Sequence, residues 1–494
     1  MTVEERQGID ETGKGAVRAG RLWLAALAVL FVLRSALGAA VPGFLTGDDV
    51  EILEQGFRRA FGLEVDVWEI RNTLLADLFV APALALAAVL GVEAPRWLCW
   101  AATVPFTLLS VASVALLGGI VLAWSRDRAL AALAALLFAL HWMPFGYAGT
   151  VYPRTASTTC VLGALALIGS RSSTARVCAA GVLAALAFAF RYSEVVFLPV
   201  LLAFAIARRT GEDSKAAGLR RGGGVVSGFA IGAALFVGLH DLVQWGRPFA
   251  SLLEFARYTL VEERASSLET DQPWYWYLRR LPKWLDPAAT LLVLVAIRRR
   301  LLPWAWIAAA VPLVLLSIVY HKQLRYLQGV IPFVCVLAAS GALHLWRDGR
   351  KRAAFALVLA SLFLSVWPLR FLARKSGPAV AAASAMASDP TVRVVAVEQS
   401  WAYGGRIFLG PRIAPRPLGY APAPGELERA IDGADRAALY AESLHDHPEL
   451  EAVLDRHEFR EESRHAGPPG RTVVVFRSCP QPAGEPELAT RCWL

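Results

Sequence analysis

Long apolar runs alternate with short polar segments over most of the chain. Runs of roughly 20 apolar residues are long enough to cross the hydrocarbon core of a bilayer as helices. The run 73–92 carries Asp77 and Pro82, so we expect a re-entrant or interfacial segment there and not a span. About eleven spans are predicted, at 22–41, 97–124, 129–148, 155–170, 177–190, 195–207, 224–243, 285–297, 302–319, 326–346 and 353–373. The pattern therefore predicts a polytopic α-helical membrane protein.

The C-terminal part of the chain has a different pattern. Strand-like apolar runs occur at 392–397 and 472–476, and a helical stretch is expected near 426–457. This mixture favours a small soluble α/β domain. The chain then divides into an N-terminal segment at 1–21, a membrane domain at 22–373 and this tail at 374–494.

Composition agrees with a membrane protein. Hydrophobic residues make up 56% of the chain, against about 45–50% in soluble domains. The net charge of +9 comes from basic residues that cluster in short loops between apolar runs. Such loops report topology, so the charge gives no reason to expect nucleic acid as a partner. The abundance of arginine and alanine is typical of a GC-rich, bacterial genome.

The basic loops predict the orientation. One set of alternate loops is rich in arginine and lysine, and the positive-inside rule places these loops in the cytoplasm. They carry Arg126, Arg128, Arg171, Arg176, Arg208, Arg209, Lys215, Arg220, Arg221, Arg298, Arg299, Arg300, Arg347, Arg350, Lys351 and Arg352. The N-terminus at 1–21 is then cytoplasmic. The first loop at 42–96, the loop at 244–284, His321 and the tail lie outside the cell membrane.

Two adjacent acids, Asp48 and Asp49, lie in the first outside loop. Acids in the first turn of a helix are favoured by the helix dipole, so capping alone is one explanation. The other explanation is a general base at the membrane surface, where a lipid-linked substrate presents its head group. Asp48 is the first candidate for that base, and Asp49 orients the acceptor or substitutes for it.

Further polar segments lie on the same predicted face. They are Phe61-Gly62, Trp68-Glu69-Ile70-Arg71-Asn72, Tyr152-Pro153-Arg154, Asp241 with Trp245-Gly246 and Glu254–Tyr258, Pro273–Tyr277, and His321-Lys322-Gln323-Leu324-Arg325-Tyr326. With the exception of Tyr152-Pro153-Arg154, these segments resemble, in their order along the chain, the motifs of the Alg9-like mannosyltransferases, a group of GT-C-fold glycosyltransferases. The Thr46-Gly47-Asp48-Asp49 loop is similar to that family's His-Pro-Asp-Glu loop. The segment 321–326 is similar to its His-Lys-Glu motif, with glutamine in place of the glutamate.

The resemblance implies a chemistry. It implies a polyprenyl-phosphate sugar as donor, a glycan or glycolipid hydroxyl as acceptor, transfer with inversion, no metal and no cofactor beyond the lipid-phosphate co-substrate. Mannose is the sugar that the family suggests. The donor phosphate is expected to bind His321, Lys322, Arg325 and Arg191. The remaining substrate contacts are expected from Trp68, Glu69, Arg71, Arg154, Asp241, Trp274 and Trp276.

Simpler interpretations remain for several of these residues. Basic residues at helix ends also anchor a protein at the interface, which applies to the segment 321–325, Arg154 and Arg191. Trp274 and Trp276 fit an interfacial aromatic belt as well as a sugar platform. Two other functions are open: a transporter or flippase of lipid-linked sugars, and an inactive glycan-binding relative. A transporter is disfavoured because its polar residues would gather near the midplane.

Overall fold

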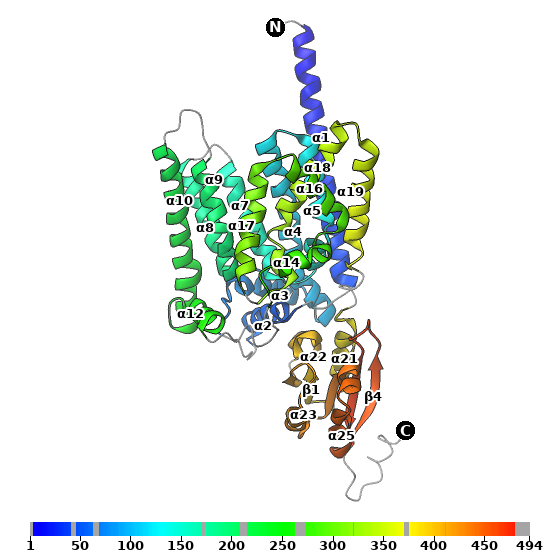
Figure 1. The fold of residues 1–494 in the computed structure, drawn as a ribbon. Helices are drawn as coiled ribbons and strands as arrows, with labels where there is room; N and C mark the ends of the chain where they lie inside the picture. Colours follow the sequence, from blue (N-terminus) through cyan, green and yellow to red (C-terminus); the bar gives the residue numbers. More distant parts are fainter. Residues whose placement is uncertain are drawn as a thin grey trace, which may run out of the picture.

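The computed structural model describes residues 3–40, 46–62, 69–169, 173–207, 215–261, 272–319, 321–369, 375–410 and 412–479. Most of these residues are helical and form one bundle, from which the tail projects on one side (Figure 1). The N-terminal end of the first helix projects from the opposite side of the bundle. A helical membrane domain followed by a small sheet domain is therefore what the structure contains.

The membrane domain consists of helices and short helical turns. They are α1 (Val3–Ala40), α2 (Gly47–Phe61), η1 (Ala76–Val80), α3 (Ala81–Val89), α4 (Pro95–Ser125), α5 (Arg128–Leu140), α6 (Trp142–Tyr147), α7 (Pro153–Gly169), α8 (Thr174–Phe190), η2 (Tyr192–Phe197), α9 (Leu198–Ala207), α10 (Lys215–Ala233), η3 (Ala234–Leu239), α11 (His240–Trp245), α12 (Ala250–Ala256), η4 (Arg257–Val261), α14 (Trp276–Arg279), α15 (Leu281–Trp284), α16 (Pro287–Arg298), α17 (Pro303–Ile318), η5 (Leu324–Leu327), α18 (Ile331–Arg347) and α19 (Lys351–Val366). Of these, η1, η3 and η4 are π-helical, and η2 and η5 are 3₁₀ turns.

Length and hydropathy single out three membrane-crossing segments among the described residues: Gly20–Ala40, Pro95–Ser125 and Lys215–Trp245. The other apolar helices are shorter, and a central one, α18, is buried along almost its whole length. Shorter helices of this kind cross a bilayer only where neighbouring helices and irregular turns cover their ends.

Glycines set the spacing of α8 and α10. A Cβ at Gly181 would collide with the carbonyl oxygen of Val225, and one at Gly228 with that of Cys178. Only glycine lets two helix backbones approach this closely, which is a common way of packing helices in membranes. Figure 1 shows the two helices side by side at one edge of the bundle.

Two predicted elements need correction. The run 129–148 is not one helix, because α5 ends at Leu140 and His141 takes an extended backbone. The His141 ring accepts a hydrogen bond from the Met143 amide at 3.2 Å, and this contact starts the separate helix α6. The stretch 426–457 is not continuously helical either, because it contains a strand described below.

The first outside loop forms helices at the edge of the bundle. Helix α2 buries Val50, Leu53 and Phe57, spaced three and four residues apart, and so lies flat against its neighbours. A Cβ at Gly56 would overlap the Val80 side chain, so glycine permits close contact between α2 and η1. The run 73–92 thus forms η1 and α3, which Figure 1 shows beside α2 at the end of the bundle that faces the tail.

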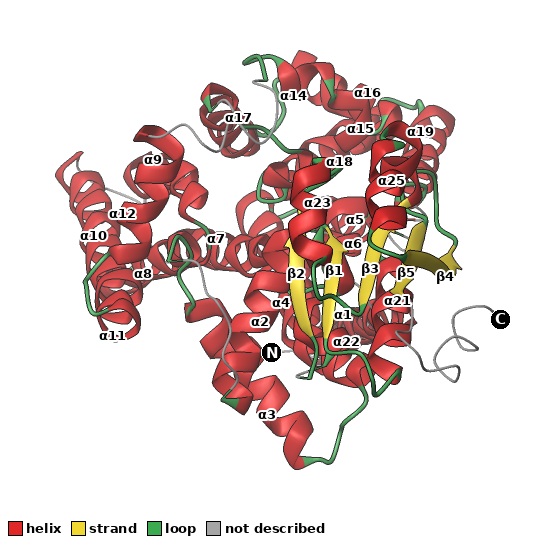
Figure 2. Cartoon of the chain, turned by 90° about the horizontal axis from the view of Figure 1, so that it is seen from below, coloured by secondary structure: helices red, strands yellow, loops and turns green. Residues whose placement is uncertain are grey.

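The tail is a five-stranded sheet with helices. Its strands are β1 (Val394–Glu398), β2 (Ala414–Leu418), β3 (Arg436–Tyr440), β4 (Phe459–His465) and β5 (Val473–Ser478), in the order β2-β1-β3-β5-β4. Strands β2, β1 and β3 are parallel, and β5 runs antiparallel to β3 and β4. The helical elements are α21 (Gly377–Ser388), η6 (Ser400–Tyr403), α22 (Gly405–Leu409), α23 (Pro424–Ile431), α24 (Ala441–Asp446) and α25 (Glu449–Arg456). Figure 2, seen from below, shows these strands side by side in one layer in front of the membrane helices.

The tail rests on α2. Elements η6 and α22 follow β1 and contact α2, and the Glu54 carboxylate lies directly against Gly405. Gly405 has a φ of 52°, a conformation that favours glycine. The helix that carries the two adjacent acids therefore packs against both the membrane domain and the tail.

Candidate active site

Asp48 lies in the first turn of α2, at the mouth of a cavity of about 310 Å³. Its carboxylate is 7% exposed. The cavity is formed by segments far apart in the sequence and is lined by Asp48, Ile70, Arg71, Arg154, Arg191, Ser193, Phe255, Tyr258, Thr259, Leu316, Val319, His321, Gln323, Arg325 and Tyr326. One carboxylate thus shares a cavity with several guanidinium groups.

Three guanidinium groups lie close to the Asp48 carboxylate. Arg71 Nη2 donates a hydrogen bond to Oδ1 at 2.6 Å. Arg191 Nη1 lies 3.4 Å from Oδ1, and Arg325 Nη2 lies 3.9 Å from Oδ2. Asp48 Oδ2 is buried and makes no hydrogen bond with any described residue, so its lone pairs are unused within the protein.

Arg154 is held separately, deeper in the protein. Its Nη1 donates to Glu194 Oε1 at 2.5 Å and to the carbonyl oxygen of Tyr326 at 3.1 Å, and its Nη2 donates to Ser193 Oγ at 2.8 Å. Arg154 and Glu194 are both almost fully buried, with side-chain exposures of 2% and 1%. Charges at this depth must be paired, so the pair fixes the geometry of the cavity wall.

The Tyr326 ring lies among the arginines. The guanidinium carbons of Arg154, Arg191 and Arg325 are 4.6, 5.9 and 5.9 Å from its centroid. Contacts of this length are favourable between a cation and an aromatic face. The ring therefore helps to hold three like charges near one another without a bound anion.

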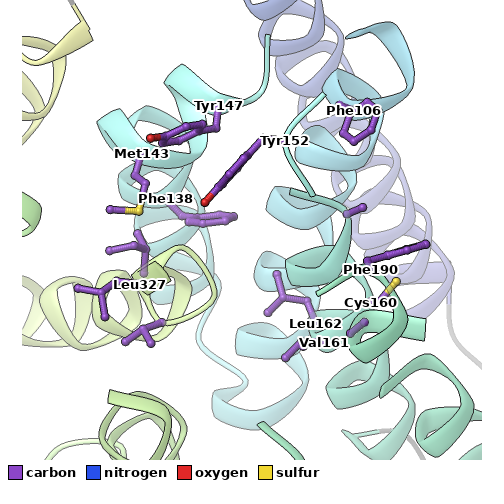
Figure 3. Packing of buried hydrophobic residues seen from close by; sticks show 14 of the residues in the cluster. Phe106, Phe138, Met143, Tyr147, Tyr152, Cys160, Val161, Leu162, Phe190 and Leu327 are labelled. Atoms are coloured by element: carbon purple, nitrogen blue, oxygen red, sulfur yellow. The ribbon is translucent and has the colours of Figure 1, made fainter. Parts of the chain in front are cut away.

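The buried core fixes the turn that carries Arg325. Leu327 ends the 3₁₀ turn η5 and is fully buried. Figure 3 shows Leu327 in the cluster that contains Phe138 and Tyr152. Tyr152 also stacks on Tyr147, with ring centroids 4.3 Å apart. Because the 3₁₀ turn is anchored at Leu327, the preceding Arg325 is presented to the cavity.

The arginines dominate the electrostatics of Asp48. Burial by itself raises the pKa of this carboxyl group, but the nearby charges of Arg191, Arg71 and Arg325 hold the pKa well below its usual range. Asp48 is therefore ionised beside these arginines. An anion that attracts these arginines away from Asp48 would raise that pKa and make the carboxylate a stronger base.

Most of the predicted phosphate ligands meet at the cavity. Arg191, His321 and Arg325 line it together with Asp48. Lys322 is not among the lining residues, because its ammonium group donates to the carbonyl oxygens of Gln272, at 2.8 Å, and Val319. The contact with Gln272 connects the segment 321–326 to the loop before α14.

The predicted substrate-binding residues are divided. Arg71 and Arg154 line the cavity. Asp241 is fully buried and accepts hydrogen bonds from the Ser251 amide at 2.9 Å and from Asn72 Nδ2 at 3.2 Å. This arrangement joins the loop after Arg71 to the helices beyond α10.

The remaining candidates that the structure describes do not line the cavity. Asp49 is fully buried and accepts a hydrogen bond from Thr46 Oγ1 at 2.9 Å. Glu69 pairs with Arg247 at 2.8 Å. Trp274 is 68% exposed, as an interfacial aromatic residue would be. Trp276 is partly buried, and Trp68 lies outside the described residues.

Sequence reasoning missed two acids of the site. Glu51 accepts a hydrogen bond from Arg71 Nε at 3.0 Å, and Glu194 holds Arg154. Each had a signal in the sequence: Glu51 follows Asp48 by three residues, one turn along a helix, and Glu194 interrupts an apolar run. Among the described residues, no group of three His, Cys, Asp or Glu could hold a metal ion.

Solved structures share this fold. The apo structure of ArnT from Cupriavidus metallidurans aligns with 94% of this chain and 98% of its own length, with a TM-score of 0.64 and 14% identity. The same enzyme bound to undecaprenyl phosphate aligns with a TM-score of 0.61 and 14% identity, over 95% of this chain and 100% of that one. The oligosaccharyltransferase of Archaeoglobus fulgidus aligns with a TM-score of 0.49 and 13% identity, over 86% of this chain and 71% of that one. No curated protein matches the sequence significantly.

The helical bundle with loop helices beside it, together with the match of a family model to most of the chain, identifies a GT-C glycosyltransferase. A sequence model of the Alg9-like mannosyltransferase family matches residues 70–392. This chain belongs to the Alg9-like mannosyltransferase family.

Proposed function

We propose that this protein transfers one sugar, mannose, from a polyprenyl-phosphate donor to a hydroxyl of a glycan or glycolipid on the outer face of the cell membrane. The single observation that carries the proposal is the Asp48 carboxylate in a cavity lined by arginines. A membrane position for the donor is supported by the similar enzyme ArnT, which was solved with undecaprenyl phosphate bound.

The donor phosphate would bind the arginines whose guanidinium groups are not already hydrogen-bonded to a carboxylate. Arg191 lies 3.4 Å from Asp48 Oδ1, Arg325 lies 3.9 Å from Oδ2, and His321 lines the same cavity. Guanidinium groups bind phosphate oxygens through paired, charge-assisted hydrogen bonds. They would stabilise the negative charge that develops on the leaving phosphate.

Asp48 would act as the base on the opposite side of the reacting carbon. The acceptor hydroxyl gives its proton to Asp48 Oδ2, and its oxygen forms a bond to the anomeric carbon. The bond from that carbon to the phosphate oxygen breaks, and its electron pair leaves with the polyprenyl phosphate. Attack from the face opposite the phosphate inverts the anomeric configuration. The donor already carries its leaving group, so this step calls for no further cofactor.

The proposed topology places about eleven crossings in the membrane, with the N-terminus in the cytoplasm of a bacterial cell. Among the described elements, the connections α4–α5, α16–α17 and α18–α19 lie at the end of the bundle away from the tail. They carry Arg126, Arg299 and Arg350, in agreement with the positive-inside rule for cytoplasmic loops. The cavity, α2 and the tail would then face outward, where a polyprenyl-linked sugar and a surface glycan can meet.

The proposal can be tested with purified protein and a panel of polyprenyl-phosphate sugars. We expect release of polyprenyl phosphate, by transfer or by slow hydrolysis, with the mannosyl donor fastest, and no use of nucleotide sugars. The Asp48→Asn variant is the matched control for activity that depends on the cavity. Transfer from a nucleotide sugar, or export of an intact lipid-linked sugar without bond cleavage, would contradict the proposal.

A further inference from the structure

The arginines of the cavity are held in two different ways. Arg154 and Arg71 donate hydrogen bonds to carboxylates at 2.5 and 2.6 Å. The guanidinium groups of Arg191 and Arg325 approach Asp48 only at 3.4 and 3.9 Å and donate no hydrogen bond to any described residue. An arriving phosphate can therefore bind Arg191 and Arg325 without breaking a short hydrogen bond.

Arg71 is held at two points by one helix. Its Nη2 donates to Asp48 Oδ1 at 2.6 Å and its Nε donates to Glu51 Oε2 at 3.0 Å. Asp48 and Glu51 are three residues apart on α2, so they lie on the same face of the helix. One guanidinium group thus bridges two carboxylates across a helical turn.

We propose that Glu51 is a positioning residue, which holds Arg71 on Asp48 so that the donor phosphate binds Arg191 and Arg325 and not Arg71. The inference rests on the proposed function and deepens it. Nothing in the family resemblance or in the motif around Asp48 assigns a role to Glu51. Its carboxylate does not line the cavity and so acts through Arg71.

Without Glu51, Arg71 would have one carboxylate partner and a free Nε. The phosphate would then attract Arg71 as well, since an arginine with two free donors binds a phosphate in a bidentate way. Asp48 would lose the hydrogen bond that orients Oδ1 and keeps Oδ2 toward the acceptor. The donor would still bind, and the proton transfer would be slower.

The proposal predicts a specific effect on the basicity of Asp48. The charged groups that face Asp48 are Arg71 from the loop before η1, Arg154 from α7, Arg191 from the end of α8, Arg325 from η5, and Glu51 from α2 itself. Loss of Arg71 from Asp48 would raise the pKa of Asp48, because an opposite charge in direct contact is removed. Loss of the Glu51 charge alone would lower that pKa, because a like charge is removed. The two effects have opposite signs.

The test compares wild type with Glu51→Gln, which keeps the size and removes the charge. We expect kcat to fall by about tenfold or more, as for other groups that orient a base. Affinity for a short-chain polyprenyl phosphate should stay the same or increase. The acid limb of the kcat–pH profile reports the pKa of the base in the enzyme–substrate complex. This limb should move to higher pH, because Arg71 would no longer lie on Asp48 and the pKa of Asp48 would rise. Glu451→Gln, which makes the same change at an exposed position of α25 in the tail, should leave all three measurements unchanged.

A second variant covers the case in which Glu51→Gln does not fold. Arg71→Lys keeps the charge, but a single ammonium group cannot bridge both carboxylates in the planar geometry of arginine. It should reproduce the loss of kcat, and the double variant should be no worse than Arg71→Lys alone. An acid limb that moves to lower pH, or weaker phosphate binding with unchanged kcat, would overturn the proposal.

The outcome separates this inference from the proposed function. If wild type transfers sugar and Glu51→Gln does so equally well, the positioning role is wrong and the function stands. If wild type transfers no sugar from any polyprenyl donor, the function is wrong. Phosphate affinity still tests the inference in that case: weaker binding by Glu51→Gln would count against it.

Discussion

Replacing Asp48 by asparagine should separate chemistry from donor binding. Asn keeps the size of the side chain and can still accept from Arg71, but it cannot take a proton from the acceptor. Loss of a general base typically lowers the rate by about 10²–10⁴-fold. At the same time the cavity loses the one carboxylate that competes with the phosphate for Arg191 and Arg325. We therefore expect slower transfer together with tighter binding of polyprenyl phosphate.

The size of the binding gain follows from the geometry. A phosphate bound to Arg191 and Arg325 would lie about 6 Å from the Asp48 carboxylate, since both arginines already reach within 4 Å of it. Two like charges at that distance repel by about 3 kcal/mol at an effective dielectric constant of about 20. The cavity is open to water at its mouth, so about half of that value is realistic, and affinity should rise by about tenfold.

Binding can be measured by isothermal titration of the detergent-solubilised protein with a short-chain polyprenyl phosphate, and transfer with the mannosyl donor. High salt should reduce the difference in affinity between the two proteins. An Asp48→Asn protein that transfers sugar at the wild-type rate would refute Asp48 as the base. If Asp49→Asn were inactive at the same time, the role would move to Asp49. Weaker phosphate binding by Asp48→Asn would refute the electrostatic reasoning.

Three further predictions concern binding, packing and topology. Arg325→Ala should lower kcat/KM for the donor by about 10–100-fold, the value of about one charged hydrogen bond, while the protein still purifies as a single species; unchanged donor kinetics would make it a membrane anchor. Gly228→Ala should destabilise the bundle by about 1–3 kcal/mol, because the new methyl group meets the Cys178 carbonyl oxygen, and a thermal-unfolding midpoint in detergent measures this. In intact cells, a cysteine at Arg247 should react with a membrane-impermeant thiol reagent and one at Arg350 should not; the reverse pattern would invert the proposed orientation.

Much of the helical bundle could be predicted from hydropathy, and several site residues could be predicted from their motifs. Asp48, Arg191 and Arg325 lie in separate loops, yet the predicted topology already placed them on one face. What the sequence could not provide is the direction of each side chain. Lys322 and Arg325 are three residues apart, but the turn η5 directs Arg325 into the cavity while Lys322 binds backbone carbonyl groups.

The errors have physical causes. Strand β3, Arg436–Tyr440, has no β-branched residue, and its alanines and leucine favour a helix when they are considered alone. Pairing with β1 and β5 on both sides overrides that preference. The break at His141 depends on a side-chain contact with the next backbone amide, which hydropathy does not register. Glu51 was overlooked because its role depends on a partner 20 residues away.

Helix α2 contacts both the membrane domain and the tail. One of its faces packs on the membrane domain, and Glu54 lies against the tail at Gly405. The arginines that face Asp48 come from elsewhere in the membrane domain, so a small tilt of the tail would change the spacing between the base and the phosphate site. A molecule that binds the tail far from the cavity could then alter the reaction rate through α2 alone. Selection on the tail would in that case act on its docking surface more strongly than on its exposed side.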